Sequence, residues 1–130
     1  MRFFIFTEVF MTDRLFRFWY YTVSHSMALL RSVGKGGEDN IDIFFAAVSY
    51  IEIPTDMDGI TIEDPTEDDK EYISRKLGDY RGDITVLVQG GKRFYIVAEV
   101  RRIKRNKLDF FELPFDIPSD MSGKFSTLHE

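Results

Sequence analysis

The sequence predicts a single α+β domain over residues 1–130, built mostly from an antiparallel sheet or a partly open barrel of about seven strands, with one helix near residues 66–77. Three observations support this fold class. The length of 130 residues suits one hydrophobic core. Aromatic residues are frequent, with 13 Phe, 6 Tyr and 1 Trp, and such side chains favour strands. Only one stretch carries a clear helix start.

The first half of the chain reads as a hairpin followed by a long strand. Residues 16–23 and 27–33 are rich in aromatic and apolar side chains, and the short interval between them predicts a hairpin. Residues 34–40 hold three glycines and form a loop. Residues 41–53 predict a strand longer than usual, so we expect a break or bulge near Ala46 and Ala47.

The predicted helix begins at Pro65 and Thr66. Thr66 is a suitable N-cap, Asp69 occupies the capping-box position, and acidic residues in the first turn complement the helix dipole. Gly78 is the residue type that ends helices. The predicted apolar stripe of this helix is narrow and consists chiefly of Tyr72, Ile73 and Leu77.

The last third predicts a hairpin from residues 84–89 and 92–100, because Gly90 and Gly91 supply the positive φ angles of a tight turn. A second turn within 101–106 and a last strand at 108–113 follow. We expect residues 116–130 to be an irregular tail. At the other end, Met11 offers an alternative start, which would make residues 1–11 a dispensable extension.

Several classes of function are disfavoured by composition. The absence of cysteine excludes disulfides, thiolate metal sites and cysteine nucleophiles, and is compatible with the cytoplasm. Glu8 interrupts the apolar N-terminal run too early for a signal peptide, and no window has the length of a membrane span. We therefore expect no membrane association.

Catalytic and metal motifs are also lacking. The segment Ser24–Ser26 around His25 is better explained by a turn than by a catalytic site, and His129 is next to the end of the sequence. The acidic residues near Gly59 do not match a calcium loop, so we interpret Asp56–Gly59 as a turn. The sequence thus predicts a protein that is not an enzyme and needs neither metal nor cofactor, whose state is a monomer or a homodimer.

Charge is the strongest functional signal. The net charge is −5, and the segment from residue 52 to residue 71 contains nine acidic residues and one lysine. Some of these acids have local roles at the helix start, but their sum creates a negative potential that steers basic partners. We predict a protein-interaction module of a small bacterial type, comparable to proteins that neutralise basic toxins, with partner-binding residues Asp56, Asp58, Glu63, Asp64, Glu67, Asp68 and Glu71.

An alternative function rests on the basic segment 92–107, which has seven basic residues and one acidic residue. Basic groups interleaved with aromatic residues such as Phe94 and Tyr95 are used to bind single-stranded nucleic acid. The competing interpretation is that these bases protect a strand edge or pair with the acidic residues. In the alternative, RNA or another anionic ligand contacts Lys92, Arg93, Arg101, Arg102, Lys104 and Arg105.

Overall fold

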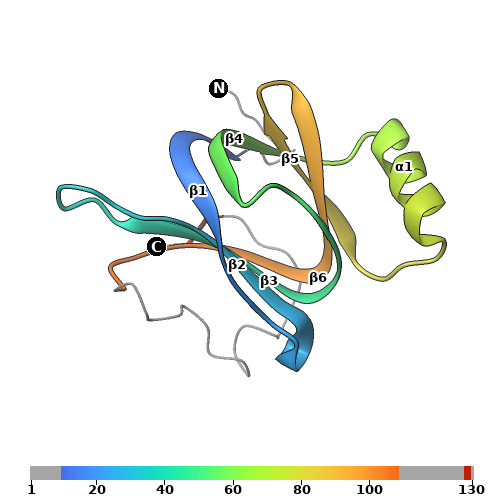
Figure 1. Cartoon of the computed structure of the whole chain (residues 1–130), viewed down its shortest axis with the longest axis horizontal. Coiled ribbons are helices and arrows are strands. Elements are labelled where there is room, and N and C mark those ends of the chain that lie inside the picture. The colour runs from blue at the N-terminus through green and yellow to red at the C-terminus, as the bar shows by residue number, and fades with distance from the viewer. Residues whose placement is uncertain (1–9, 109–127, 130) are drawn as a thin grey trace.

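The computed structural model describes residues 10–108 and 128–129, and these form one small α+β domain. A single helix stands beside a strongly curved sheet (Figure 1). The elements, in chain order, are β1 (Phe10–Thr22), a 3₁₀ turn (Ser24–Ser26), β2 (Met27–Ser32), β3 (Asn40–Glu52), β4 (Asp56–Glu63), α1 (Glu67–Leu77), β5 (Asp83–Gln89), β6 (Lys92–Asn106) and β7 (Leu128–His129).

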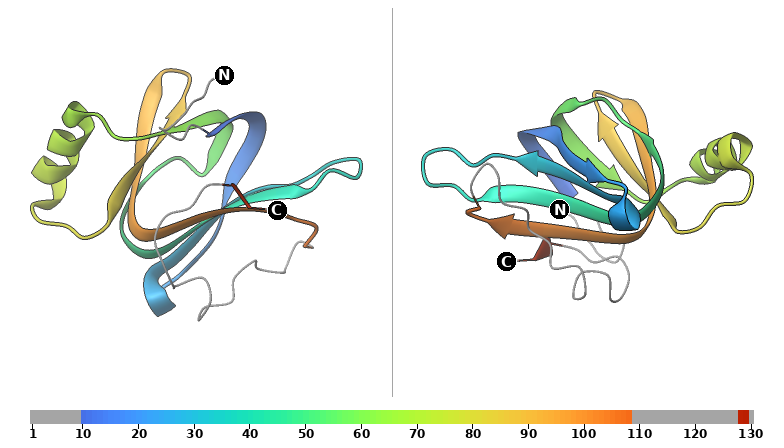
Figure 2. Two further views of the ribbon diagram at one scale, coloured as in Figure 1. Left: turned by 180° about the vertical axis from the view of Figure 1, so that it is seen from behind. Right: turned by 60° about the horizontal axis from the view of Figure 1, so that its bottom comes forward.

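Six antiparallel strands close into a barrel. Their pairing runs β3–β2–β1–β4–β5–β6, and β3 also pairs with β6 along almost its whole length, which completes the ring. Two further views show the ring and the helix outside it (Figure 2). The described chain therefore has six antiparallel strands instead of about seven; β7 adds only a two-residue parallel pairing with β6. Unpaired strand edges favour aggregation, and closure of the ring leaves few of them.

Hydrophobic residues form three groups. The largest fills the barrel and includes Phe16, Ile43, Phe45 and Ile96. A second group lies on the opposite face of β2, β3 and β6, where Phe44 pairs with Arg102 across the strands while its neighbour Phe45 joins the barrel interior. The third group lies beneath α1 and contains Ile73, Tyr72 and Leu77, as the helical pattern predicts.

The long strand β3 contains the expected irregularity. Ala47 has φ 51°, and the register against β6 shifts between Val48 and Tyr50. The backbone turns over at this point, because Ala46 belongs to the outer group whereas Val48 packs against the barrel interior. A bulge increases twist and bending, so this one lets β3 follow the barrel wall.

Two predicted turns are strands. Asp56–Gly59 belongs to β4, where Gly59 has φ 74° and lies beside a register shift in the pairing with β1. Residues 101–106 continue β6 without a break, because six successive residues pair with β3. The hairpin at Gly90 and Gly91 is confirmed, with both glycines at positive φ.

Three predictions about the chain ends fall mostly outside the described residues, which leave out 1–9, 109–127 and 130. They are the dispensable extension at 1–11, the last strand at 108–113 and the irregular tail at 116–130. Met11, which offers an alternative start, lies in β1 and pairs with Thr61.

Candidate functional site

The predicted acidic residues separate into two groups. Four lie on α1 and the turn before it, and all are exposed to solvent; we call this group the helical acidic face, and it consists of Asp64, Glu67, Asp68 and Glu71. Glu67 is 3.4 Å from Lys70 Nζ and Glu71 is 3.2 Å from an Arg75 nitrogen. Within residues 10–108, Asp64 and Asp68 make no ion pair.

The other three predicted acids lie along β4. Asp56 is 3.8 Å from Arg17 Nε, Asp58 is exposed, and Glu63 is half-buried 3.4 Å from an Arg93 nitrogen. A strand advances about 3.3 Å per residue, so Asp56 lies roughly 25 Å along the chain from the helical acidic face. The structure therefore does not gather the seven residues into one compact patch.

Asp69 fastens the helix to the barrel. Its carboxylate accepts hydrogen bonds from Arg93 Nε at 2.9 Å, from Arg93 Nη2 at 2.6 Å and from the Tyr95 hydroxyl at 2.8 Å. It also accepts the Thr66 backbone N–H at 2.8 Å, while the Thr66 hydroxyl oxygen accepts the Asp69 N–H, which confirms the predicted capping box. Asp69 is thus both a helix cap and a buried link to β6.

The electrostatics of this link follow from its contacts. The Arg93 guanidinium holds the pKa of Asp69 well below its usual range, with help from Thr66 and Tyr95. Burial, and then the hydrogen bond to Asp69, raises the pKa of Tyr95 to about 12. At neutral pH Asp69 is charged and Tyr95 is a neutral donor, so the group suits attachment of a helix and lacks a base or a nucleophile poised near pH 7.

A second carboxylate holds the same side of the helix. Glu52 at the end of β3 accepts hydrogen bonds from the hydroxyl of Tyr50 and, at 2.8 and 3.0 Å, from the hydroxyl of Tyr72 on α1. The bond to Glu52 raises the pKa of Tyr50 to about 12. The Tyr72 and Tyr95 rings lie 5.2 Å apart, which joins the two attachments. Together they fix the position of α1.

The predicted basic residues do not share one surface. Lys92 is exposed at the hairpin, and Arg93 is engaged by Asp69 and Glu63. Farther along β6, the residues alternate between faces: Arg101 and Arg105 lie opposite Phe45 and Ile41 in β3, whereas Arg102 and Lys104 lie opposite Phe44 and Asp42. The segment 92–107 thus offers no continuous basic surface along its length.

A pocket lies between the helix connections and the barrel. It has a volume of about 490 Å³ and is lined by Asp64, Pro65, Lys70, Tyr80, Gly82, Asp83, Ile84 and Arg101. It brings together one residue predicted for partner binding, Asp64, and one predicted for anion binding, Arg101. The sequence predicts no binding role for the other residues of this lining, because the pocket forms only when both connections of α1 meet β6.

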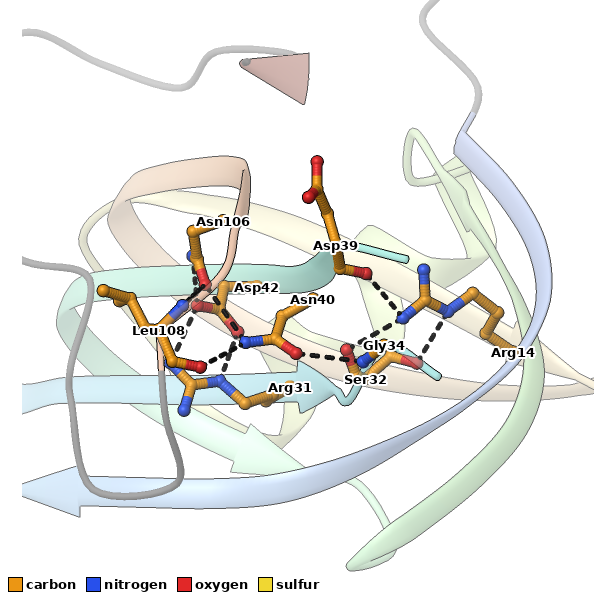
Figure 3. Close-up of polar contacts among 9 residues, drawn as sticks. All are labelled: Arg14, Arg31, Ser32, Gly34, Asp39, Asn40, Asp42, Asn106 and Leu108. Atoms are coloured by element: carbon orange, nitrogen blue, oxygen red, sulfur yellow. Dashed lines mark hydrogen bonds and ion pairs between the residues drawn. The ribbon is translucent and has the colours of Figure 1, made fainter. Parts of the chain in front are cut away.

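A buried polar network occupies another part of the barrel wall (Figure 3). Arg31 Nε donates to Asp42 Oδ1 at 2.7 Å and Arg31 Nη2 donates to Asp42 Oδ2 at 3.0 Å, with both side chains almost fully buried. The Asn106 amide donates to Asp42 Oδ2 at 2.7 Å, and the Asn40 amide donates to the Leu108 carbonyl at 2.8 Å. The guanidinium also lies 5.4 Å from the centre of the Trp19 ring.

Sequence reasoning missed this network, although a signal existed. Residues 27–33 and 41–53 flank the glycine-rich loop, and antiparallel pairing across that loop sets Arg31 opposite Asp42. Two opposite charges inside two apolar strands indicate a buried ion pair. Arg14 extends the polar contacts by donating to the Ser32 hydroxyl and to the Ser32 and Asp39 carbonyls. The network braces the loop and the exit of the chain from β6.

No protein-family model, curated protein or solved structure matches this chain. In the part of the chain that the structure describes, no helix is long and apolar enough to cross a membrane. The same residues contain no group of three side chains suited to hold a metal ion. His25 lies exposed in the 3₁₀ turn with φ 60°. The described fold is a closed six-stranded antiparallel barrel with one helix attached outside.

Proposed function

We propose that this protein is a non-catalytic interaction module that binds a basic protein partner through the helical acidic face. The observation that carries the proposal is that four exposed carboxylates lie on α1 and the turn before it, and that Asp69 fixes this helix to the barrel. Proteins of a small bacterial type that neutralise basic toxins are the class that such charge complementarity suggests.

Rigid presentation favours this function. A side chain or segment that is ordered before binding loses less conformational freedom when the complex forms. The attachments through Asp69 and Glu52 hold α1 in place before any partner arrives. The exposed charges then act mainly on the association rate and on the choice of partner, because charges at a solvated rim contribute little to affinity.

The acids of β4 have unequal roles in this proposal. Asp56 and Asp58 are exposed and extend the negative potential away from the helix. Glu63 is partly neutralised by Arg93, so we assign it to positioning of the helix connection. The core of the proposed surface is therefore the helical acidic face.

The proposal is tested with two triple variants that change net charge equally. One carries Asp64→Lys, Asp68→Lys and Glu71→Lys. The matched control carries Asp13→Lys, Glu38→Lys and Glu99→Lys, three exposed acids that belong neither to α1 nor to the turn before it. Immobilised wild type and both variants are used to capture basic proteins from a lysate of the source organism, and the association rate of the captured protein is then measured against salt concentration.

The expected result is a basic partner retained by the wild type and by the control variant, with an association rate that falls as salt increases. The helical variant should associate about ten-fold or more slowly. If both triple variants capture the partner equally, the response does not depend on where the charges are changed. That result would leave net charge as the only cause and would contradict a site on the helix. A lack of any retained basic protein would also contradict the proposal.

A further inference from the structure

We propose that the outer apolar face of β2, β3 and β6 is the docking site of residues 109–127 of the same chain. This face consists of Met27, Leu29, Phe44, Ala46 and Val100, with Trp19 of β1 packed against it. The contact is made within one chain, so it goes beyond the protein partner proposed above and does not depend on it.

The outer apolar face is buried although it lies outside the barrel. Leu29 and Phe44 have no exposed surface, and neither has Asp42, which lies on the same face of β3. A closed sheet shields only the side chains that point inward, so a buried outer face needs a second layer. Among residues 10–108, the one helix does not supply this layer, because α1 packs on a different group that includes Val86 of β5 and Val97 of β6 (Figure 1).

The chain leaves β6 and returns to it beside this face. The Leu108 carbonyl accepts the Asn40 amide at 2.8 Å, next to the buried Arg31–Asp42 pair, and Leu128 pairs in parallel with Ile103 of β6. Three neighbouring strands span only about 10 Å, whereas the 19 residues from 109 to 127 reach up to about 60 Å when extended. The segment is therefore long enough to cross the face and return.

Residues 109–127 have the composition that such a face would bind. They include four Phe together with Leu113, Ile117 and Met121, so they carry apolar side chains whose burial is favourable. They also hold four acidic residues and one lysine, which complements Arg102 and Lys104 on the same side of β6. Residues 1–9 are apolar as well, but they lead into Phe10, which packs towards the barrel interior and pairs with β4.

Trp19 provides the first test, because it is the single tryptophan of the chain and packs against the face. One full-length variant carries Phe110→Ser and Phe111→Ser. The matched control carries Phe3→Ser and Phe4→Ser, the same changes in the N-terminal segment. Fluorescence emission and acrylamide quenching of Trp19 are measured, while the amide signals of Ile43 and Ile96 report whether the barrel is intact.

A spin label provides a second test that leaves the apolar side chains unchanged. The chain has no cysteine, so Ser119→Cys carries a nitroxide at one defined position. Broadening of amide signals is measured within the labelled chain. It is measured again in a mixture of isotope-labelled wild type with spin-labelled chain that carries no isotope, which detects contacts between two copies.

We expect the Phe110→Ser and Phe111→Ser variant to shift Trp19 emission to longer wavelength and to increase its quenching, with the barrel intact and the control unchanged. The nitroxide should broaden Leu29 and Phe44 more than Leu77, and only within one chain. An unchanged Trp19, an equal response to Phe3→Ser and Phe4→Ser, or weak broadening at the face would each overturn the proposal. Broadening in the mixture would assign the face to a second copy and overturn it too. Neither test needs a protein partner, so failure here is distinct from failure of the capture experiment.

Discussion

At the scale of single residues, the Arg31–Asp42 pair shows how the barrel accommodates charge in its wall. Taking two ions out of water is costly, and the cost is offset here by bidentate geometry, by the Asn106 amide and by the Trp19 ring. Replacing one member of the pair removes a bidentate, charge-assisted contact while the other charge stays buried. The pair is therefore a sensitive point of the fold even if an apolar pair of equal volume could stand in its place.

We predict that Asp42→Asn lowers the free energy of unfolding by about 3–5 kcal/mol, because it removes the charge of one member of a buried bidentate ion pair. Arg31→Met combined with Asp42→Leu should restore much of this loss, since neither charge of the pair then remains buried. Both are measured by urea denaturation.

The exposed pair between Arg17 and Asp56 provides the matched control for that measurement. It also joins an arginine and an aspartate on neighbouring strands, but both side chains are about 60% exposed and 3.8 Å apart. Asp56→Asn should cost less than about 1 kcal/mol. A loss at Asp42 no larger than the loss at Asp56 would refute the assignment of the buried pair as a stabilising contact.

At the scale of elements, the attachment of α1 depends on the ionised form of Asp69. The folded protein holds the pKa of Asp69 below its unfolded value of about 3.9, so the stability it contributes is present above that pH and is lost as the pH falls further. Asp69→Asn removes this contribution. We expect it to lower the free energy of unfolding by roughly 2–4 kcal/mol near pH 7, with the difference from wild type shrinking below about pH 4.

The neighbouring residue supplies the control for this pH dependence. Asp68→Asn changes the same side-chain type in the same helical turn, but Asp68 is exposed and makes no ion pair with residues of the described chain. Its effect should be small at every pH. Urea denaturation from pH 2 to pH 7 measures both variants, and a constant difference between Asp69→Asn and wild type across this range would contradict the role of the Asp69 charge.

Elements governed by local chemistry were predictable from the sequence. The Thr66 cap, the end at Gly78 and the Gly90–Gly91 hairpin depend on residues within a few positions of one another, and all three appear as expected. The predicted turn at Asp56–Gly59 is wrong because Gly59 supplies its positive φ inside a strand, next to a shift in the pairing with β1. That shift depends on a distant segment of the chain. The predicted turn within 101–106 is wrong because pairing with β3, a distant segment of the chain, keeps these residues extended.

At the scale of the whole molecule, closure of the sheet and the position of the site result from long-range pairing. The meeting of β3 with β6 is not encoded in any short motif, so the sequence could predict an antiparallel sheet or a barrel without deciding between them. The pairing of β6 with β3 and with β5 distributes the six basic residues among different faces, and the two connections of α1 create the pocket. The placement of charges along the sequence therefore differs from their placement in space.

The architecture also predicts how the molecule opens. The helix lies outside the closed ring and is attached through Ile73, Leu77 and the contacts of Asp69, whereas each barrel strand pairs with two others. We expect α1 to open without unfolding the barrel, so that the amides of Tyr72 and Ile73 exchange with solvent faster than those of Ile43 and Ile96. Native-state hydrogen exchange measures these amides individually.

A variant in the barrel wall distinguishes this local opening from global unfolding. The buried Arg31–Asp42 pair is intact both in the native state and in a state with only α1 open, so Asp42→Asn alters the two states equally and leaves the exchange of Ile73 unchanged. It brings the native state closer in free energy to the unfolded chain, so the exchange of Ile43 and Ile96 should accelerate by a factor of about 100 or more, as expected for 3 kcal/mol or more. Equal acceleration at Ile73 would show that helix and barrel open only together, and α1 would then be an integral part of one cooperative fold.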